Sequence, residues 1–380
     1  MAGDGNRSGY RHLLDAFWDE ATSFGLKLRT KSPVSAAAFT KARRKIPAEA
    51  VRKLVHQAAD AFDEEFGAAH RWFGRRVFAV DGTKMNLRRA TELREKFGVP
   101  KGAYCPQALV STLFNLVSKV PHDVVVGPVD DAERAQLYDL LGRVRPGDVL
   151  VLDRGYPSFE ILLMLADAGI DFVMRVPAQN TFQAVTDFVA GGTKDRLLWI
   201  TPPRGPLQNR APMQVRAVIV NPPKGERTVL ITSFRDRDEI TRSDLASLYR
   251  MRWNIETFYK LEKGVYLGQG QFHSESVEGV KQELQSLALF VAIARTTMAA
   301  AAQSTGMTYS TLSPKSACLG FAAYIVRLLL TRSQKDAARL LNRLLARIVR
   351  TRDPVRPDRS FPRRSFLPTR KWGPKGRRGG

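Results

Sequence analysis

The sequence predicts a mixed α/β protein whose strand-rich centre lies between two helical ends, and three observations support this fold class. Apolar residues recur at helical spacing in residues 1–70 and again from about 241 to 350. Short β-branched and apolar runs of strand length dominate from residue 75. Hydrophobic residues make up 44% of the 380 residues, which allows a sizeable core and two or three domains.

The N-terminal region, residues 1–70, is predicted to hold three helices, at 9–25, 34–46 and 48–66. Four basic residues cluster at the joint between the second and third helices: Lys41, Arg43, Arg44 and Lys45. Two interpretations stay open. These helices form either a small DNA-binding unit or a helical bundle with a solvated basic edge.

The centre, residues 71–275, is predicted to be an α/β domain. Its first strands are VFAVDGTKM, QALVSTLFNLVS and HDVVVGPV, and helix DDAERAQLYDLLGRV separates them from strand GDVLVLD and helix SFEILLMLADAG. Further strands at about 172–234 are joined by turns rich in Pro and Gly, which indicates a β-rich insertion. A helical C-terminal region at 276–350 and a basic tail at 351–380 complete the predicted organisation.

The balance of charge points to a polyanionic partner. Lys and Arg number 60 against 37 Asp and Glu, a net charge of +23, and the tail alone holds ten Lys or Arg against two Asp. The tail is expected to be extended and suited to a phosphate backbone, with a solubilising role as the alternative.

Several classes of protein are disfavoured. The most apolar window, 287–302, contains Arg295 and is shorter than the ~20 residues that span a membrane. The first 20 residues contain no apolar segment of the kind expected in a signal peptide, and Cys105 and Cys318 give no CxxC pattern. The sequence contains no GxxxxGK[ST] motif, so ATP binding is not indicated. We expect a cytoplasmic protein that contacts nucleic acid and no membrane.

One predicted helix, residues 249–263, carries an ordered stripe. At ~100° per residue, four side chains fall within an arc of about 60°. They are Tyr249, Arg252, Glu256 and Lys263. Trp253 flanks the stripe, whereas Glu262 is expected on the opposite side, in solvent. Taken alone, such a stripe is more often a solvated face with weak ion pairs.

Two aspartates follow apolar strands. Asp81 and Asp153 are each predicted at a strand end, where α/β proteins commonly build their sites. The alternatives are a hairpin turn at Asp81-Gly82 and a plain strand-to-helix turn after Asp153. Together with Glu256 they form a set of oxygen ligands suited to Mg²⁺, and two such ions ~3.5–4 Å apart can promote phosphoryl transfer.

At these residues the sequence resembles DDE transposases of bacterial insertion sequences, in the insertion-sequence-four family. The family's Y-(2)-R-(3)-E-(6)-K signature matches Tyr249, Arg252, Glu256 and Lys263 at every interval. DGT at Asp81 and DRGY at Asp153 are similar to the family's two aspartate motifs. Both end regions are similar as well, so the resemblance extends over most of the chain.

The resemblance implies an RNase H-like core with a β-strand insertion between the second Asp and the Glu. It implies that Asp81, Asp153 and Glu256 are catalytic and hold two Mg²⁺ ions, with Mn²⁺ as a substitute. It further implies cut-and-paste transposition: cleavage of double-stranded DNA at terminal inverted repeats, then joining to target DNA by a homodimer assembled on the DNA.

The resemblance also implies that a base beside the cleavage point is flipped out of the duplex. Tyr249, Arg252 and Lys263 would contact the neighbouring phosphate. An aromatic side chain would stack on the base, with Trp199 as the first candidate and Trp253 as the second. The alternative for Trp199 is a strand core residue.

Two other functions are also consistent with the sequence. One is a catalytically silent regulator that binds DNA ends, although binding alone needs no acids. The other is an RNase H-like nuclease, which would not need the stripe or the basic tail.

Overall fold

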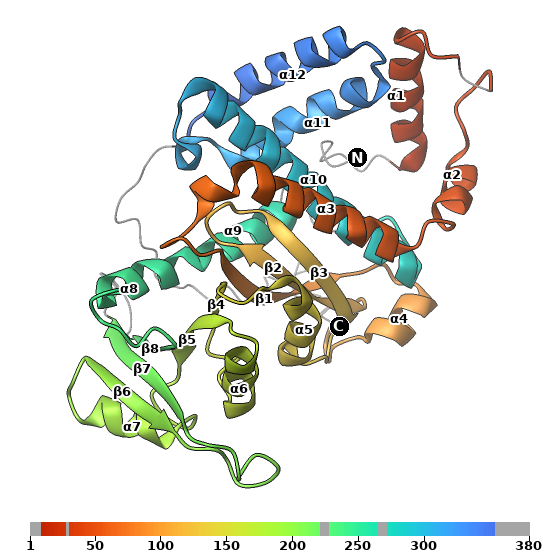
Figure 1. Ribbon diagram of the computed structural model, residues 1–380. Coiled ribbons are helices and arrows are strands. Elements are labelled where there is room, and N and C mark those ends of the chain that lie inside the picture. The colour runs from red at the N-terminus through yellow and green to blue at the C-terminus, as the bar shows by residue number, and fades with distance from the viewer. Residues whose placement is uncertain (1–8, 28–29, 221–227, 264–271, 354–380) are drawn as a thin grey trace, which may run out of the picture.

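The computed structural model describes residues 9–27, 30–220, 228–263 and 272–353, and in this part of the chain eight strands form one sheet (Figure 1). The strand order is β3-β2-β1-β4-β5-β8-β7-β6. The strands are β1 (Val77–Asn86), β2 (Gln107–Asn115), β3 (Pro121–Pro128), β4 (Val149–Leu152), β5 (Asp171–Val176), β6 (Asp195–Ile200), β7 (Met213–Val220) and β8 (Thr228–Thr232). Most of the predicted tail, residues 354–380, lies outside the described residues.

Helices cover both faces of this sheet and form the helical ends. Those of the first half are α1 (Tyr10–Ser23), α2 (Ala36–Arg43), α3 (Ala48–Phe66), α4 (Thr91–Phe97), α5 (Glu133–Leu140) and α6 (Phe159–Asp167). Those of the second half are α7 (Gln183–Ala190), α8 (Arg242–Met251), α9 (Trp253–Leu261), α10 (Val277–Thr305), α11 (Pro314–Leu330) and α12 (Gln334–Val349).

The first five strands have the RNase H-like arrangement. β1, β2 and β3 pair antiparallel in sequence order, and β4 then pairs parallel to β1 on its other side, followed by parallel β5. The predicted fold class is therefore confirmed: a mixed α/β protein with an RNase H-like core and helical ends.

The segment predicted as a β-rich insertion continues the same sheet. Within about 172–234, β5 belongs to the core because it pairs with β4. β8 pairs antiparallel with β5, and β7 and β6 follow outward. This segment also contains α7, which the sequence analysis did not predict.

The core strands are buried on both faces, which explains their continuous apolar runs. Along β1, Val77 and Ala79 face one cluster of buried side chains, and Phe78 and Val80 face another. Helices α8, α9, α10 and α11 contribute to the first cluster, and α5, α6 and α7 to the second.

Helix α10 contains the apolar window, residues 287–302, for which the sequence predicts no membrane crossing. The whole helix has 29 residues, long and apolar enough by length and composition to do so. However, 61% of its most apolar window is buried within the fold, and α10 packs against α3, α11 and β3. Burial of this kind is typical of a core helix.

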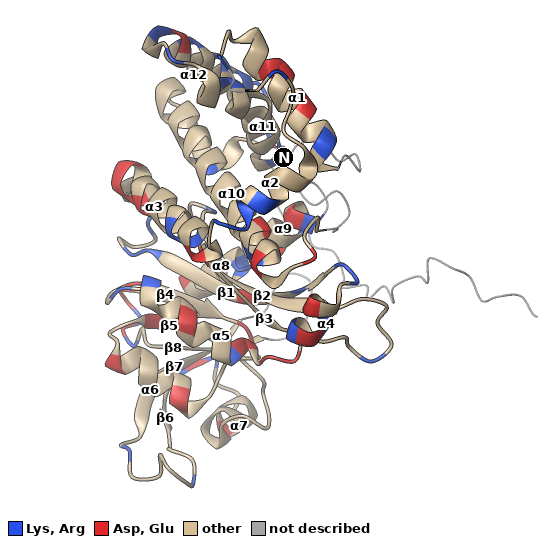
Figure 2. Ribbon diagram, turned by 90° about the vertical axis from the view of Figure 1, so that its right-hand side faces the viewer, with Lys and Arg blue, Asp and Glu red and all other residues tan. Residues whose placement is uncertain are grey.

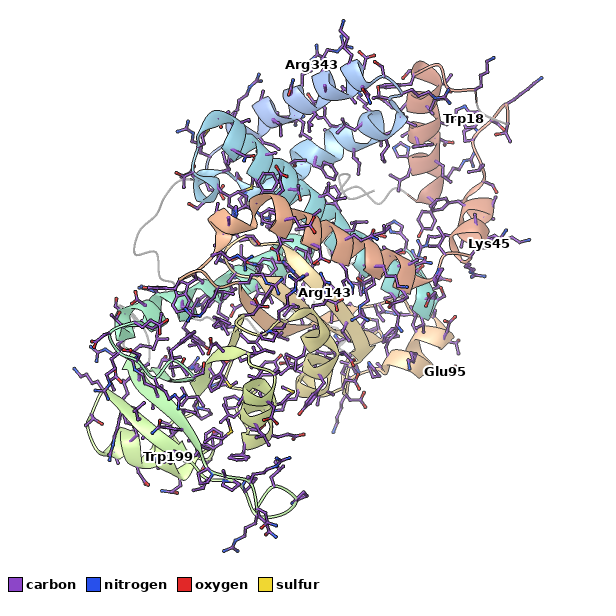
Figure 3. All side chains as sticks on the ribbon, viewed as in Figure 1. Trp18, Lys45, Glu95, Arg143, Trp199 and Arg343 are labelled. Atoms are coloured by element: carbon purple, nitrogen blue, oxygen red, sulfur yellow. The ribbon has the colours of Figure 1, made fainter. Side chains whose placement is uncertain are left out.

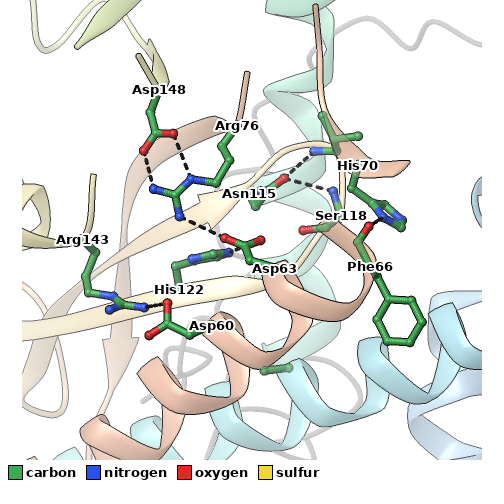
Figure 4. Close-up of polar contacts among 12 residues, drawn as sticks. Asp60, Asp63, Phe66, His70, Arg76, Asn115, Ser118, His122, Arg143 and Asp148 are labelled. Atoms are coloured by element: carbon green, nitrogen blue, oxygen red, sulfur yellow. Dashed lines mark hydrogen bonds and ion pairs between the residues drawn. The ribbon is translucent and has the colours of Figure 1, made fainter. Parts of the chain in front are cut away.

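Charged side chains connect α3 to the beginnings of β1 and β4 (Figure 4). Arg76, which precedes β1, donates from Nε and Nη2 to the two carboxylate oxygens of Asp148, which precedes β4, at 2.9 and 2.5 Å. Its Nη1 donates to Asp63 of α3 at 2.9 Å. Arg76 is 3% exposed, so this network ties together three elements inside the protein.

His122 lies beside this network and is fully buried. Burial, assisted by the positive charges of Arg76 and Arg143, lowers the pKa of His122 to about 3. In the unfolded chain the pKa returns to about 6.5. Between these values the unfolded chain binds a proton that the folded chain does not, so stability decreases as the pH falls.

Replacing His122 by Phe should weaken the loss of stability at acid pH. The contribution of this one group is about 1.4 kcal/mol per pH unit below pH ~6.5. Urea unfolding at pH 7 and pH 5 would measure it as the difference between wild type and His122→Phe. His12→Phe, at an exposed site, is the control. The same pH dependence in wild type and His122→Phe would contradict this assignment.

Candidate catalytic centre

Asp81 lies in the middle of β1, so the predicted strand end at this residue was wrong. The strand continues to Asn86, and Asp81 lies opposite Thr112 of β2 rather than in a hairpin turn. The Asp81 carbonyl oxygen accepts a hydrogen bond of 2.6 Å from the Tyr259 hydroxyl of α9. The second half of β1 is polar, and its pairing with β2 keeps it extended.

Asp153 follows β4 directly, as predicted. A turn closes behind it, since the Tyr156 N–H donates to the Asp153 carbonyl oxygen at 3.2 Å. Val77 of β1 lies opposite Val149 of β4, and each aspartate follows its valine by four residues. Asp81 and Asp153 are therefore brought to the same side of the sheet.

Two helices, rather than one, carry the predicted stripe. α8 ends at Met251 and α9 begins at Trp253, with Arg252 at the junction. The Arg252 N–H bonds to the Tyr249 carbonyl, and the Ile255 N–H bonds to the Arg252 carbonyl, both at a spacing of three residues. The turn is thus tighter than an α-helical turn at Arg252. The backbone of Arg252 nevertheless stays close to helical, so Glu256 still lies on the same side of the helix as Arg252.

Arg252 gathers the three predicted acids around one guanidinium. Its Nη2 lies 2.5 Å from Oε1 of Glu256. Its Nη1 lies 3.8 Å from Oδ2 of Asp81 and 4.0 Å from Oδ2 of Asp153. Arg252 is only 4% exposed. The structure therefore brings Asp81, Asp153 and Glu256 together, as the sequence predicts.

The remaining members of the stripe lie on either side of this cluster. The Tyr249 ring centroid is 6.0 Å from Cζ of Arg252. Nζ of Lys263 donates to Oγ1 of Thr83 at 2.6 Å and to the carbonyl oxygen of Lys84 at 3.0 Å. Lys263 thus places an ammonium beside the part of β1 that follows Asp81.

The crowding of acids changes the proton affinity of Asp81. Burial raises the pKa of Asp81 to about 6, and the charges of Glu133, Glu256 and Asp153 act in the same direction. Arg252 opposes them by favouring the ionised form. An excess of negative charge therefore remains at the centre of a strongly basic protein.

Comparison with known families agrees with this geometry. The family model described as "Transposase DDE domain" matches residues 72–293, more than half of the chain, and spans all three acids. This chain belongs to the DDE transposase family.

Two proteins of Escherichia coli (strain K12) are similar to this DDE transposase. The transposase InsG for insertion sequence element IS4 is 24% identical over 356 residues, which cover 89% of this chain and 78% of InsG. InsZ, named as a candidate transposase, is 28% identical over 148 residues, which cover 37% of this chain and about half, 49%, of InsZ. The predicted relation to insertion-sequence-four transposases is confirmed as a distant homology.

A solved structure of a piggyBac transposase synaptic complex with hairpin DNA is also similar. Its TM-score is 0.42 at 12% identity, and the match covers 75% of this chain and 59% of the piggyBac chain.

Membership of the family implies the use of a divalent metal, and the residues of this centre fit one. The three acids supply only oxygen ligands, the type that Mg²⁺ and Mn²⁺ prefer. They converge on a single positive group, and burial, followed by repulsion from the neighbouring acids, raises the pKa of Asp81. The fit is one of ligand type. Within the described residues, no three His, Cys, Asp or Glu side chains are close enough to one another to surround an ion, and each of the three acids contacts Arg252 instead.

The predicted position of Glu262 was wrong. It was expected in solvent, yet it is 3% exposed. Burial raises the pKa of Glu262 to about 8, opposed by the neighbouring Lys263. Helical spacing places Glu262 opposite the stripe, and the rest of the fold covers this side of the helix.

The two candidate aromatic residues lie in different places. Trp199 is 59% exposed on β6, the outermost strand, so the alternative of a strand core residue was wrong (Figure 3). Four strands separate β6 from β1, and the structure does not bring Trp199 to the acids. Trp253 is 46% exposed at the start of α9, three residues before Glu256.

Sequence analysis missed one carboxylate near the centre, Glu133 at the start of α5. It contributes to the raised pKa of Asp81, and the charge of Asp153 in turn raises the pKa of Glu133, after burial. The available signal was Gly82, which follows Asp81 and leaves room for another side chain beside it.

Replacing Glu262 by Gln should stabilise the protein at alkaline pH. The folded state holds the proton of Glu262 up to pH about 8, whereas the unfolded chain loses it near pH 4.3. Stability is therefore lost as the pH rises between these values, on the order of 3 kcal/mol from pH 5 to pH 8. In urea unfolding, the free energy of unfolding of Glu262→Gln should rise relative to that of wild type as the pH increases. Glu95→Gln, at an exposed site, should show no such change. A constant difference would refute the buried, protonated Glu262.

Proposed function

We propose that this protein is an active transposase that cuts and joins the ends of its own insertion sequence by a cut-and-paste route. The observation that carries the proposal is the convergence of Asp81, Asp153 and Glu256 on Arg252, since this places three acids from separate parts of the chain at one point. A DNA-binding protein without catalytic activity has no need for such a cluster inside a chain of net charge +23.

The reaction has two chemical steps. Water attacks a phosphorus atom at the element's end, and the P–O3′ bond breaks, which leaves a 3′-OH and a 5′-phosphate. The 3′-OH then attacks another phosphodiester, either on the opposite strand or in target DNA. One P–O bond forms as another breaks, so this joining step needs no ATP.

Asp81, Asp153 and Glu256 would hold two Mg²⁺ ions, with Mn²⁺ as a substitute, and bound ions supply activation of the attacking oxygen and stabilisation of the leaving oxygen. The basic side chains of the protein would instead contact the DNA phosphate. Lys263, fixed by Thr83 and the carbonyl of Lys84, presents positive charge to a phosphate beside β1. Tyr249 and Arg252 complete the set proposed to hold the phosphate beside a flipped base.

The partner in this proposal is double-stranded DNA, both the terminal inverted repeats and the target, bound by a homodimer in the cytoplasm at the nucleoid. Lys and Arg residues lie on α2 and α12, and both helices are set apart from the sheet (Figure 2). Near α2, Lys41, Arg44 and Lys45 are exposed, whereas Arg43 turns inward to Gln282 and Glu283 of α10. The exposed residues support the DNA-binding interpretation of the N-terminal region.

The test of this function uses DNA that flanks the gene, incubated with the purified protein and Mg²⁺. Wild type should make discrete cuts at matching inverted repeats, and Asp153→Ala should bind the same DNA without cutting it. A sequencing gel and a gel-shift measurement separate the two properties. Binding without cuts by wild type would instead indicate a silent end-binding regulator. Cuts without sequence preference would indicate an RNase H-like nuclease.

Arg252→Ala should slow hairpin formation or resolution more than it slows the first strand cut. The variant removes the proposed phosphate contact beside the flipped base, and the loss of one charged hydrogen bond costs about 1.5–3 kcal/mol, or roughly 10–100-fold in rate. Single-turnover kinetics on a labelled end would measure each step. Arg252→Lys retains the charge without the guanidinium fork and serves as the matched variant. An equal loss at every step would refute this role.

A further inference from the structure

Helix α12 carries a row of basic side chains on its outer side. At ~100° per residue, the members of this row fall within an arc of about 120°, and the row is about 22 Å long. All of them are exposed, and they are Lys335, Arg339, Arg343, Arg347 and, at the C-cap, Arg350. Arg343 points outward from α12 (Figure 3). The row therefore presents a line of positive charge to solvent.

The opposite side of α12 is covered by the fold. Leu344 and Ile348 belong to the cluster of buried side chains that also contains residues of α10 and α11, and Leu340 is buried as well. A basic helix that binds a membrane surface needs a free apolar side to enter the lipid. Since the apolar side of α12 already packs against the fold, it is the basic row that is available to a partner.

Like charges follow one another along the row with little compensation. From Lys335 to Arg347 the members are four residues apart, a spacing at which like charges destabilise a helix. Arg339 pairs with Asp336 at 3.0 Å. In the described part of the chain, no acidic side chain forms an ion pair with the other members of the row. The row thus works against the stability of its own helix, which an ordinary solvated face of mixed charge would not do.

The helix dipole explains one end of the row but not the rest. Arg347 and Arg350 lie at the C-terminal end, where the dipole favours cations. Lys335 lies in the first turn, where the dipole disfavours a cation, and Arg339 and Arg343 lie between the two ends, where the effect is small. An anionic partner accounts for the whole row.

We propose that the basic row of α12 binds the phosphate backbone of duplex DNA away from the point of cleavage. This rests on the proposed function, in which DNA is the substrate. Helix α12 is set apart from the sheet that carries Asp81 (Figure 2). Each DNA strand has one phosphate per ~3.4 Å of helix axis, so a row of about 22 Å faces several phosphates. Such contacts orient a duplex without reading its sequence.

The test measures how the affinity of the full chain for a labelled duplex depends on salt, by fluorescence anisotropy in EDTA so that the DNA stays uncut. Each phosphate contact contributes about 0.9 to the slope of log Kd against log salt concentration. The triple variant Arg339→Gln, Arg343→Gln, Arg347→Gln should therefore lower this slope by about 2–3. Lysine at the same three positions keeps the charges and should leave the slope close to that of wild type.

Stability separates DNA binding from a structural role of the row. The triple Gln variant removes repulsion between like charges, so its free energy of unfolding in urea should equal or exceed that of wild type. Arg343→Gln, which breaks no ion pair within the described residues, should lower the salt slope by about one on its own. This single variant decides the question if the triple variant fails to fold. A loss of stability in Arg343→Gln with an unchanged slope would establish a structural role instead.

The matched control removes three exposed cations around β6, at the other end of the molecule from α12 (Figure 1): Lys194→Gln, Arg196→Gln and Arg204→Gln. An equal fall of the slope in this control would mean that total charge alone is measured, which would refute the role of α12. Wild type that binds DNA with the same slope as the triple Gln variant of α12 would overturn this inference alone. Wild type that binds no DNA would overturn the proposed function as well.

Discussion

The parallel pairing of β1 with β4 is the constraint on which the catalytic centre depends. Asp81 and Asp153 lie together only because Val77 is opposite Val149. A slip of one residue would send one aspartate to the other face of the sheet. The buried Arg76–Asp148 pair stands immediately before both strands and favours this register, since any slip would separate its two charges inside the protein.

The Arg252 guanidinium is the second constraint. A buried charge is costly unless it is paired, and Arg252 is paired with three acids that belong to β1, to the end of β4 and to α9. These ion pairs hold α9 against the open end of the sheet. The acids outnumber the guanidinium, so the cluster keeps a negative charge that neither Arg252 nor the neighbouring Lys263 removes.

Much of this centre could be predicted from the sequence, because it depends on local patterns. The apolar runs of β1 and β4 indicate buried strands, and the interval from Arg252 to Glu256 brings both onto one side even across the break between α8 and α9. The rest depends on tertiary packing. The polar half of β1 is extended only because β2 pairs with it, and Glu133 is separated from both aspartates in sequence.

The basic residues that would bind DNA and the acids that would hold the metal ions lie in different parts of the protein. The excess of Lys and Arg that gives +23 is spread over surfaces such as those of α2 and α12, whereas the acids of the centre are gathered at the sheet. Between exposed charges, screening limits the interaction to about 8–10 Å at moderate salt. Distant basic residues can therefore attract a phosphate backbone without neutralising the acids, which leaves the acids able to hold cations beside the same polyanion. A uniformly basic groove would repel those cations, and a uniformly acidic one would repel the DNA.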